Sequence, residues 1–363
     1  MLSPPKNPLG KNPQLSICIP THDGRAVTLE QTLQSIHAQL GDSPPGTIEV
    51  CISDGGSRDG TVAMVERIHF EFGTTLKYER ATVDGGFAAH EMRSVDMASG
   101  RHCWLFSSDD AIAPGGIETV RRVLDADPDI LGLSFPFVTY DRELIGPIVG
   151  TKAEAEDAKY FPRPWRHPRQ FESRREVARE LGVLFSYLAS HVVRGDAWAY
   201  ARATVELEGG LHSKPFPHIE IFSRMLDTGE SWRWIPQQVV LRRGENDSWT
   251  PRVFDGNQAR YWMEMLGELK RLYRDLSGQD AAVCRILMNR WRFNVAKPGH
   301  LLANRRVYGS TYTGWAEMVV GYTRSLWQSP QYWVSALPVL LIPPALLPFA
   351  VFIQHVKDQR LGR

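Results

Sequence analysis

The sequence has little cysteine, little net charge and no apolar stretch at its start, and each shortage excludes a class of protein. Four cysteines in 363 residues are too few for a disulfide-stapled fold. No two of them have the CxxC spacing of a structural zinc site. The 42 basic and 41 acidic residues nearly cancel, whereas a general nucleic-acid binder is strongly basic, so no nucleic-acid partner is expected. Residues 1–14 contain no apolar core, which predicts a disordered lead-in and no signal peptide.

Residues 15–135 show a regular alternation of strand-like and helix-like segments. Each short apolar run is followed by a polar turn and then by apolar residues at helical spacing. Repeated strand–loop–helix units predict an α/β fold, Rossmann-like, with a mainly parallel sheet flanked by helices. The expected strands are 15–20, 48–53, 76–80, 102–106 and 130–135. The first helix has Leu29, Leu33, Ile36 and Leu40 on one face, and the later helices are expected at 61–72, 87–98 and 114–125.

Polar residues gather where three of these strands end, at 21–23, 54–57 and 107–110. The carboxyl ends of parallel strands meet at one edge of a sheet, and ligands of open α/β sheets bind there. The sequence therefore predicts a binding site built from these three turns.

The rest of the chain divides by composition. Residues 140–170 are polar and proline-rich and predict a long loop, and an apolar strand is expected at 234–241. Residues 256–295 have the pattern of two amphipathic helices. We expect a catalytic domain over 15–250, in which 15–135 and 136–250 form two halves, followed by C-terminal helices at 251–330 and a hydrophobic segment with a basic tail at 331–363.

Residues 332–353 form an uncharged apolar block that contains four prolines. A helix of this length would span roughly 33 Å, about the core of a bilayer. The prolines disfavour one straight helix and predict two short halves bent at Pro343–Pro344. We expect membrane association through 332–353, with the basic tail favouring the cytoplasmic side. A buried hydrophobic helix is the alternative.

Three motifs in order resemble family-2 glycosyltransferases of the GT-A fold: LSICIPTHDGRAVTLEQTLQSIHAQ, ISDGGSRDGT and MASGRHCWLFSSDDAIAPGGIE. The segments SYLASHVVRGDAW and RRGENDSW are similar to the abequosyltransferase-like branch, which acts on lipid-linked O-antigen intermediates. The resemblance covers about residues 15–250. It implies transfer of a sugar from a nucleotide-diphosphate donor, with inversion, to a lipid-linked saccharide or other glycan in cell-surface polysaccharide synthesis.

The resemblance also implies a divalent cation, Mg²⁺ or Mn²⁺, which stabilises charge on the leaving diphosphate. The family motif is Asp-x-Asp, and here its first position is Ser107, so Asp109 is the matching metal ligand and Asp110 a second candidate. Either carboxylate could instead cap the following helix.

Further positions match the nucleotide-sugar site of the family. Asp54 is expected to accept a hydrogen bond from the nucleobase, although an Asx turn is an alternative role. Arg93, one helical turn from His90, is expected to face the diphosphate or to form a surface ion pair. Arg243 is expected to pair with phosphate oxygens or to lie in a solvated turn. The complete predicted set is Pro20, Thr21, Asp23, Asp54, Asp84, Arg93, Ser108 and Arg243.

The acceptor hydroxyl needs a general base, which the family normally supplies from an Asp in a Glu-Asp pair shortly before a helix with an Arg. Here Arg224 fits the arginine and His218 occupies the Asp position, so His218 is the first candidate and Glu220 the second. Helix capping is the alternative role of His218. The changes at 107 and 218 also leave open a non-catalytic, membrane-docked glycan- or nucleotide-sugar-binding protein with a decayed site. A sugar nucleotidyltransferase is disfavoured because PTHDGR has one glycine where those enzymes have a glycine-rich phosphate loop.

Overall fold

The computed structural model describes residues 13–41, 44, 46–72, 76–148, 166–209, 216–244, 272, 301–302, 305, 311–327, 330 and 332–360. The chain divides into two compact units, Met1–Asn246 and Asp247–Arg363, which are described separately. Almost all of the predicted lead-in and of the predicted helices at 256–295 lies outside the described residues.

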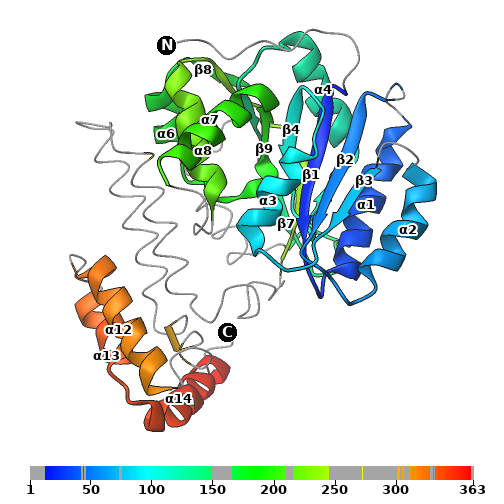
Figure 1. The fold of residues 1–363 in the computed structure, drawn as a ribbon. Coiled ribbons are helices and arrows are strands. Elements are labelled where there is room, and N and C mark those ends of the chain that lie inside the picture. Colours follow the sequence, from blue (N-terminus) through cyan, green and yellow to red (C-terminus); the bar gives the residue numbers. More distant parts are fainter. Residues whose placement is uncertain are drawn as a thin grey trace. The chain divides into compact units, whose positions relative to one another are not determined.

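The first unit is built on an eight-stranded sheet with the order β3-β2-β1-β4-β9-β6-β10-β8 (Figure 1). The strands β1 to β4 are mutually parallel, as the alternating pattern predicts. The bounds of the sheet strands are β1 Leu15–Thr21, β2 Ile48–Asp54, β3 Leu76–Arg80, β4 His102–Leu105, β6 Gly132–Ser134, β8 Arg169–Phe171, β9 His191–Arg194 and β10 Trp232–Trp234.

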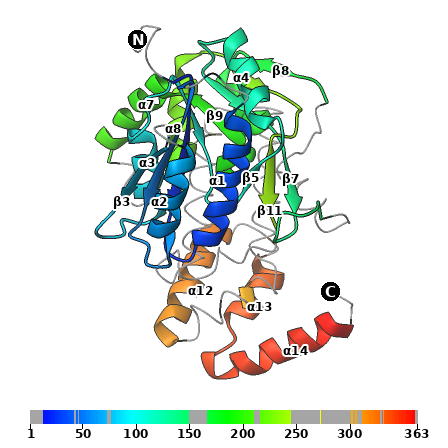
Figure 2. The ribbon, with the colours of Figure 1, turned by 90° about the vertical axis from the view of Figure 1, so that its right-hand side faces the viewer.

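Helices cover both faces of this sheet. α1 (Ala26–Leu40) and α2 (Thr61–Phe72) lie on one face, and α3 (Phe87–Asp96), α7 (Gly195–Leu207) and α8 (Pro217–Met225) lie on the other (Figures 1 and 2). α1 forms because Leu29, Leu33 and Ile36 recur at helical spacing, and all three are fully buried. The remaining elements of this unit are α4 (Gly116–Ala126), α6 (Arg174–Leu181) and the 3₁₀ turns η2 (Leu184–Ser186), η3 (Leu188–Ser190) and η4 (Leu226–Thr228).

A second, three-stranded sheet has the order β5-β11-β7, formed by Ala111–Ile112, Val240–Arg243 and Phe137–Tyr140. β11 is antiparallel to β5 and parallel to β7. Because β5 directly follows the turn at 107–110, this small sheet brings residue 243 beside that turn.

The structure corrects one expectation about the strands. The single strand expected at 234–241 is two strands, β10 and β11, which belong to different sheets. The predicted fifth strand, β6, is not a neighbour of β4, because β9 lies between them and is antiparallel to both. The segment 140–170 begins with β7 and ends with β8, and residues 149–165 between them are not described.

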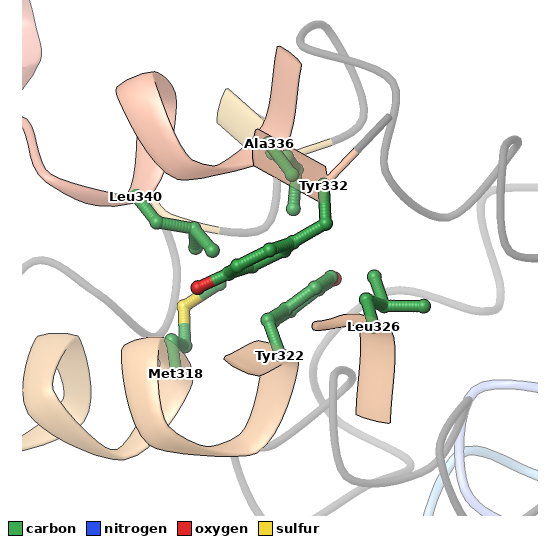
Figure 3. Packing of buried hydrophobic residues seen from close by; sticks show 7 residues of the cluster. Met318, Tyr322, Leu326, Tyr332, Ala336 and Leu340 are labelled. Atoms are coloured by element: carbon green, nitrogen blue, oxygen red, sulfur yellow. The ribbon is translucent and has the colours of Figure 1, made fainter. Parts of the chain in front are cut away.

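The second unit has its own small apolar core. α12 (Tyr312–Leu326) packs against η6 (Tyr332–Ala336) and α13 (Leu337–Leu340), and Tyr322 and Tyr332 lie next to each other at the centre (Figure 3). Thr323 and Tyr332 share a hydrogen bond of 2.5 Å between their hydroxyls. The buried cluster consists of Leu301, Met318, Tyr322, Leu326, Tyr332, Ala336 and Leu340.

The uncharged block at 332–353 is bent. Among the described residues no single helix is long and apolar enough to cross a bilayer, but Tyr332–Leu340 and Pro344–Ile353 meet that test as a pair with 89° between them. The break coincides with Pro343 and Pro344, as predicted, since proline cannot continue a helical hydrogen-bond ladder. η7 (Pro344–Leu346) and α14 (Leu347–Arg360) follow the break.

Candidate functional site

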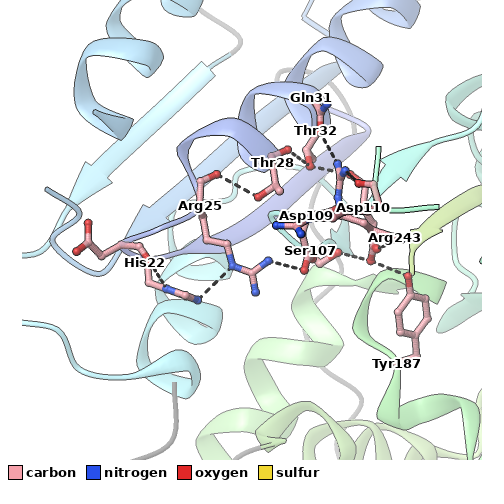
Figure 4. Close-up of polar contacts among 12 residues, drawn as sticks. His22, Arg25, Thr28, Gln31, Thr32, Ser107, Asp109, Asp110, Tyr187 and Arg243 are labelled. Atoms are coloured by element: carbon pink, nitrogen blue, oxygen red, sulfur yellow. Dashed lines mark hydrogen bonds and ion pairs between the residues drawn. The ribbon is translucent and has the colours of Figure 1, made fainter. Parts of the chain in front are cut away.

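The turns after β1, β2 and β4 meet at one edge of the large sheet. Thr21 pairs with Asp54 in the β1–β2 register, so these two strands end at the same level. β4 is in register with β1 on its other side, and its turn carries Ser107 to Asp110. The three predicted polar turns are therefore neighbours, and residues of the turns after β1 and β4 are in direct contact (Figure 4).

Asp109 forms an ion pair with Arg25 from the turn after β1 (Figure 4). The side chains are 15% and 12% exposed, so the pair is shielded from bulk water without being sealed from it. Burial alone would raise the pKa of Asp109, but the charge of Arg25 and its hydrogen bond outweigh this and hold the pKa below its usual value. Asp109 is thus an ionised carboxylate at the end of β4.

Asp110 has a different environment although it is the next residue. It is buried, its Oδ2 accepts hydrogen bonds from Ser107 and from Tyr187 at 2.6 Å, and its Oδ1 accepts the backbone N–H of Arg243 at 2.9 Å. Burial and the neighbouring charge of Asp109 raise the pKa of Asp110 to about 6. With both oxygens engaged inside the protein, Asp110 holds the turn together rather than offering a second metal ligand as predicted. Ser108 is also buried in this turn.

The guanidinium of Arg243 is turned toward the interior and links three parts of the fold, which we call the Arg243 tether. It is buried in β11, and it donates to the backbone oxygen of Asp109 at 2.7 Å, to Gln31 at 2.6 Å and to the backbone oxygen of Arg142. The predicted pairing of Arg243 with a diphosphate is therefore not what this arrangement offers. Its side chain instead joins β11, α1 and the turn after β4.

Asp54 is fully buried at the end of β2. Its Oδ1 accepts the hydroxyl of Ser57 at 2.5 Å and the Ser57 N–H at 3.0 Å, and its Oδ2 accepts the hydroxyl of Tyr78 at 2.5 Å. This is the Asx-type turn that the sequence left as an alternative to nucleobase binding. Direct contact with a base would require one of these bonds to be exchanged.

The turn after β1 holds the other predicted donor-side residues. Pro20 and Thr21 are buried, and the Thr21 hydroxyl has no partner among the described residues. Asp23 is exposed, and its Oδ1 accepts the backbone N–H of Arg58 at 2.8 Å. Asp23 therefore joins the turns after β1 and β2.

Asp84 and His90 form a polar pair beside the end of β2. The Asp84 Oδ1 lies 3.2 Å from His90 Nε2, and His90 Nδ1 lies 3.0 Å from the Ser53 hydroxyl. Gly55 makes this possible, since a Cβ there would stand 3.0 Å from Asp84 Oδ1 and 3.2 Å from His90 Nε2. A side chain at position 55 would require the pair to shift by a few tenths of an ångström.

Arg93 is not placed with His90. Its side chain is 54% exposed and pairs with Glu79 of β3, at 2.6 Å, on the outside of the sheet. The surface ion pair, which was the alternative, is the arrangement seen here, and contact of Arg93 with a diphosphate stays a prediction.

His218 is the second residue of α8 and lies in the interior. Its Nδ1 is 2.8 Å from Oε1 of Glu91 on α3, and both side chains are 1% exposed. Neither His218 Nε2 nor Glu91 Oε2 has a hydrogen-bond partner among the described residues. Glu220 lies two residues further along α8 and is half-buried.

Few side chains of the site could coordinate a cation. Among the described residues no group of three or more His, Cys, Asp or Glu side chains converges as a metal site. Asp109 alone fits, because it is ionised and partly exposed, and Mg²⁺ is commonly bound by one or two carboxylates together with substrate phosphates. Asp110 does not fit as a ligand because its oxygens are already engaged.

Sequence reasoning missed three residues that complete this site, namely Arg25, Tyr187 and Glu91. Arg25 lies 84 positions from Asp109, Tyr187 77 positions from Asp110, and Glu91 127 positions from His218. The signal for Arg25 was present, since it follows the first polar turn. Nothing local marks the other two.

Comparison with known proteins agrees with this arrangement. The family described as "Glycosyl transferase family 2" matches residues 16–191. Abequosyltransferase RfbV of Salmonella typhimurium is 28% identical over 276 residues, which cover 76% of this chain and 79% of RfbV. Residues 16–191 therefore form a family-2 glycosyltransferase domain. Within that family its sequence is abequosyltransferase-like.

Solved structures support the GT-A-like fold. TarS 1-349 of S. aureus in complex with UDP has a TM-score of 0.53 at 14% identity, covering 88% of this chain and 93% of that one. The mannosyltransferase PcManGT of Pyrobaculum calidifontis, in complex with GDP-Man and Mn2+, has a TM-score of 0.51 at 15% identity, covering 96% and 88%. At such identities the likeness concerns the fold alone.

Proposed function

We propose that this glycosyltransferase is metal-dependent and inverting, and that it moves a sugar from a nucleotide-diphosphate donor to a lipid-linked saccharide or related glycan in O-antigen or similar polysaccharide synthesis. The observation that carries the proposal is Asp109, an ionised carboxylate at the end of β4 in a family-2 domain. The likeness to RfbV, an abequosyltransferase, supports sugar transfer in O-antigen synthesis.

The reaction balances as a single displacement. The oxygen of an acceptor hydroxyl forms a bond to the anomeric carbon while the bond from that carbon to the diphosphate oxygen breaks. The electron pair leaves with the nucleoside diphosphate, and the hydroxyl proton passes to a protein base. No covalent enzyme intermediate is required, since one displacement inverts the anomeric centre.

Mg²⁺ or Mn²⁺ would be held by Asp109 and by the diphosphate oxygens. When bound, the cation offsets the negative charge that develops on the leaving group. Arg25 occupies the same carboxylate and would share it or move aside. Asp23, Asp84 and His90 border the donor side of this edge.

His218 is the proposed base and Glu220 the second candidate. An unprotonated imidazole nitrogen can take the proton of a hydroxyl. Near-native turnover in both His218→Ala and Glu220→Ala would reject the assignment of the base to this helix.

A test of the donor reaction needs no knowledge of the acceptor. Purified protein is titrated with UDP, GDP, CDP and dTDP, with and without Mn²⁺, and the affinity is measured by calorimetry. We expect one nucleotide to bind at least 10-fold more tightly with Mn²⁺, and Asp109→Asn to abolish the difference. Binding of no nucleotide under either condition would reject the proposal and favour a decayed site.

We also propose that residues 332–353 hold the protein at the cytoplasmic side of a membrane. The second unit exposes large apolar side chains on this segment, which is unusual for a surface in water. Trp333, Phe349 and Phe352 are 53%, 65% and 63% exposed. A lipid-linked acceptor would be reached from such a position.

A further inference from the structure

Glu91 and His218 form a buried carboxylate–imidazole pair. Glu91 Oε2 and His218 Nε2 have no hydrogen-bond partner among the described residues. The contact joins α3, which follows the donor-side turns, to the start of α8 in the other half of the unit. Both side chains are 1% exposed, so neither is solvated by bulk water. Burying an ionisable pair is costly unless its hydrogen bonds are satisfied. A pair with unsatisfied atoms on both members needs a reason beyond stability.

The geometry decides which nitrogen of His218 is free. Glu91 Oε1 is 2.8 Å from Nδ1, and a carboxylate only accepts, so the hydrogen bond places the proton of the neutral ring on Nδ1, which donates to Oε1. In the neutral ring Nε2 then carries the lone pair. Nε2 is buried and has no partner among the described residues. It is therefore a poised acceptor rather than part of the pair's own bonding.

α3 links the pair to the donor-side turns. The residue before Glu91 is His90, which contacts Ser53 at the end of β2 and Asp84 of the donor-side turn. Adjacent residues of α3 thus reach the donor edge and α8. Phe216 and Phe222 flank the His218 ring, with centroids 5.8 Å and 5.7 Å away, and fix its plane.

We infer that Glu91 is a positioning residue for transfer: it keeps the proton of His218 on Nδ1 so that Nε2 can take the proton of the attacking hydroxyl. This rests on the proposed function. Glu91 does not touch the substrate, and its carboxylate stabilises the imidazolium formed when the hydroxyl proton arrives. The proton passes from the acceptor oxygen to Nε2, and no other reactant is needed.

The test uses the full-length protein and the sugar nucleotide that it turns over fastest, with water as the acceptor and release of nucleoside diphosphate as the signal. For Glu91→Gln we expect kcat to fall about 100-fold while KM for the donor changes less than 3-fold. His218→Gln should lose as much. The double variant should be no slower than His218→Gln, because Glu91 acts only through His218.

Two controls separate positioning from folding. Glu49→Gln removes another buried carboxylate, one that pairs with Lys77 at 2.7 Å near the start of β2, and should keep the wild-type kcat. Glu91→Asp retains the charge and should recover part of the kcat lost in Glu91→Gln. Nucleotide affinity, measured by calorimetry, should match wild type in all these variants.

The tautomer is a second readout that needs no turnover. In ¹⁵N-histidine spectra of the wild-type protein, neutral His218 should carry its proton on Nδ1, and Glu91→Gln should change that pattern. A proton on Nε2 in the wild type, a wild-type kcat in Glu91→Gln, or additive losses in the double variant would each overturn the inference and leave the proposed function standing. Absence of turnover with every sugar nucleotide would reject the proposed function and this inference with it.

Discussion

Arg25 and a divalent cation would compete for the same carboxylate of Asp109. The guanidinium already neutralises this group and holds its pKa low. An ion pair that is 12% and 15% exposed is weakly screened by salt, so displacing Arg25 has a measurable cost. Cation affinity should therefore depend on Arg25 as well as on the ligand itself.

Replacing Arg25 by Gln should tighten Mn²⁺ binding several-fold in the absence of nucleotide, because the carboxylate loses its competitor. The dissociation constant can be followed by the paramagnetic signal of free Mn²⁺. Asp109→Asn should bind no Mn²⁺, and Arg67→Gln, which breaks an exposed ion pair with Glu30, should behave as wild type. Weaker Mn²⁺ binding in Arg25→Gln would contradict the competition.

Acid sensitivity should arise from buried histidines. Burial lowers the pKa of His191 to about 3, and its ring bonds the Ser134 hydroxyl and the Leu184 carbonyl. The unfolded chain has a histidine pKa near 6.5, so between about pH 6.5 and 3 it binds a proton that the folded chain does not. The free energy of unfolding then falls as pH falls, by at most about 1.4 kcal/mol per pH unit for this residue.

The measurement is the melting temperature from pH 7 to pH 4. His191→Gln should start lower, because its hydrogen bonds are lost, and should decline less steeply. The melting temperature of His191→Gln will still fall somewhat with pH, since burial also lowers the pKa of His102 to about 4. His37→Gln, on the exposed side of α1, should keep the wild-type slope. An equally steep decline in His191→Gln would remove His191 as the cause.

At the scale of elements, the sequence predicted β1 to β4 and their helices well because each strand is a short apolar run with a polar turn. The insertion of β9 between β4 and β6 was not predictable. Its partners lie far away in the sequence, and an apolar run of four residues fits a parallel or an antiparallel neighbour equally well. The contact between Glu91 and His218 could not be predicted for the same reason, since only tertiary packing joins α3 to α8.

The strand pair β6–β10 depends on a glycine. A Cβ at Gly132 would lie 2.4 Å from the Trp232 ring, and both residues are in the interior. Gly132→Ala should therefore cost about 1–3 kcal/mol of unfolding free energy through overpacking. Denaturant titration measures this, and Gly41→Ala, where nothing lies within 4 Å, should be nearly neutral. Equal stability of the two variants would mean that Trp232 moves aside freely.

At the scale of the molecule, the composition averages two unlike units. The unit up to Asn246 buries most of its apolar residues in the sheets and helices, while the bent segment in the other unit exposes many of its own. The sequence predicted this segment from its lack of charge and its bend from the prolines. It could not give the contacts of that segment with a bilayer, because one apolar composition serves both a core and a membrane surface.

Replacing both Phe349 and Phe352 by Glu should weaken binding to vesicles of phosphatidylcholine and phosphatidylglycerol at least 10-fold. The variant lacks two exposed rings whose transfer from water into lipid would favour binding. Sedimentation of the vesicles gives the bound fraction. Tyr200→Glu changes a comparably exposed aromatic of the other unit and should have no effect. A full-length protein that stays in the supernatant would end the membrane proposal.

The tether formed by Arg243 makes assembly of the site a late event in the life of the chain. The carboxylate of Asp110 and the amide of Gln31 receive their bonds from a residue 133 and 212 positions further on. A ribosome must therefore synthesise β11 before the turn after β4 can be locked. Until then Asp110 lacks its bond from the Arg243 backbone, although the four parallel strands beside it are already complete. An emerging chain would thus form its scaffold first and lock the turn that carries Asp109 and Asp110 only when synthesis has passed residue 243.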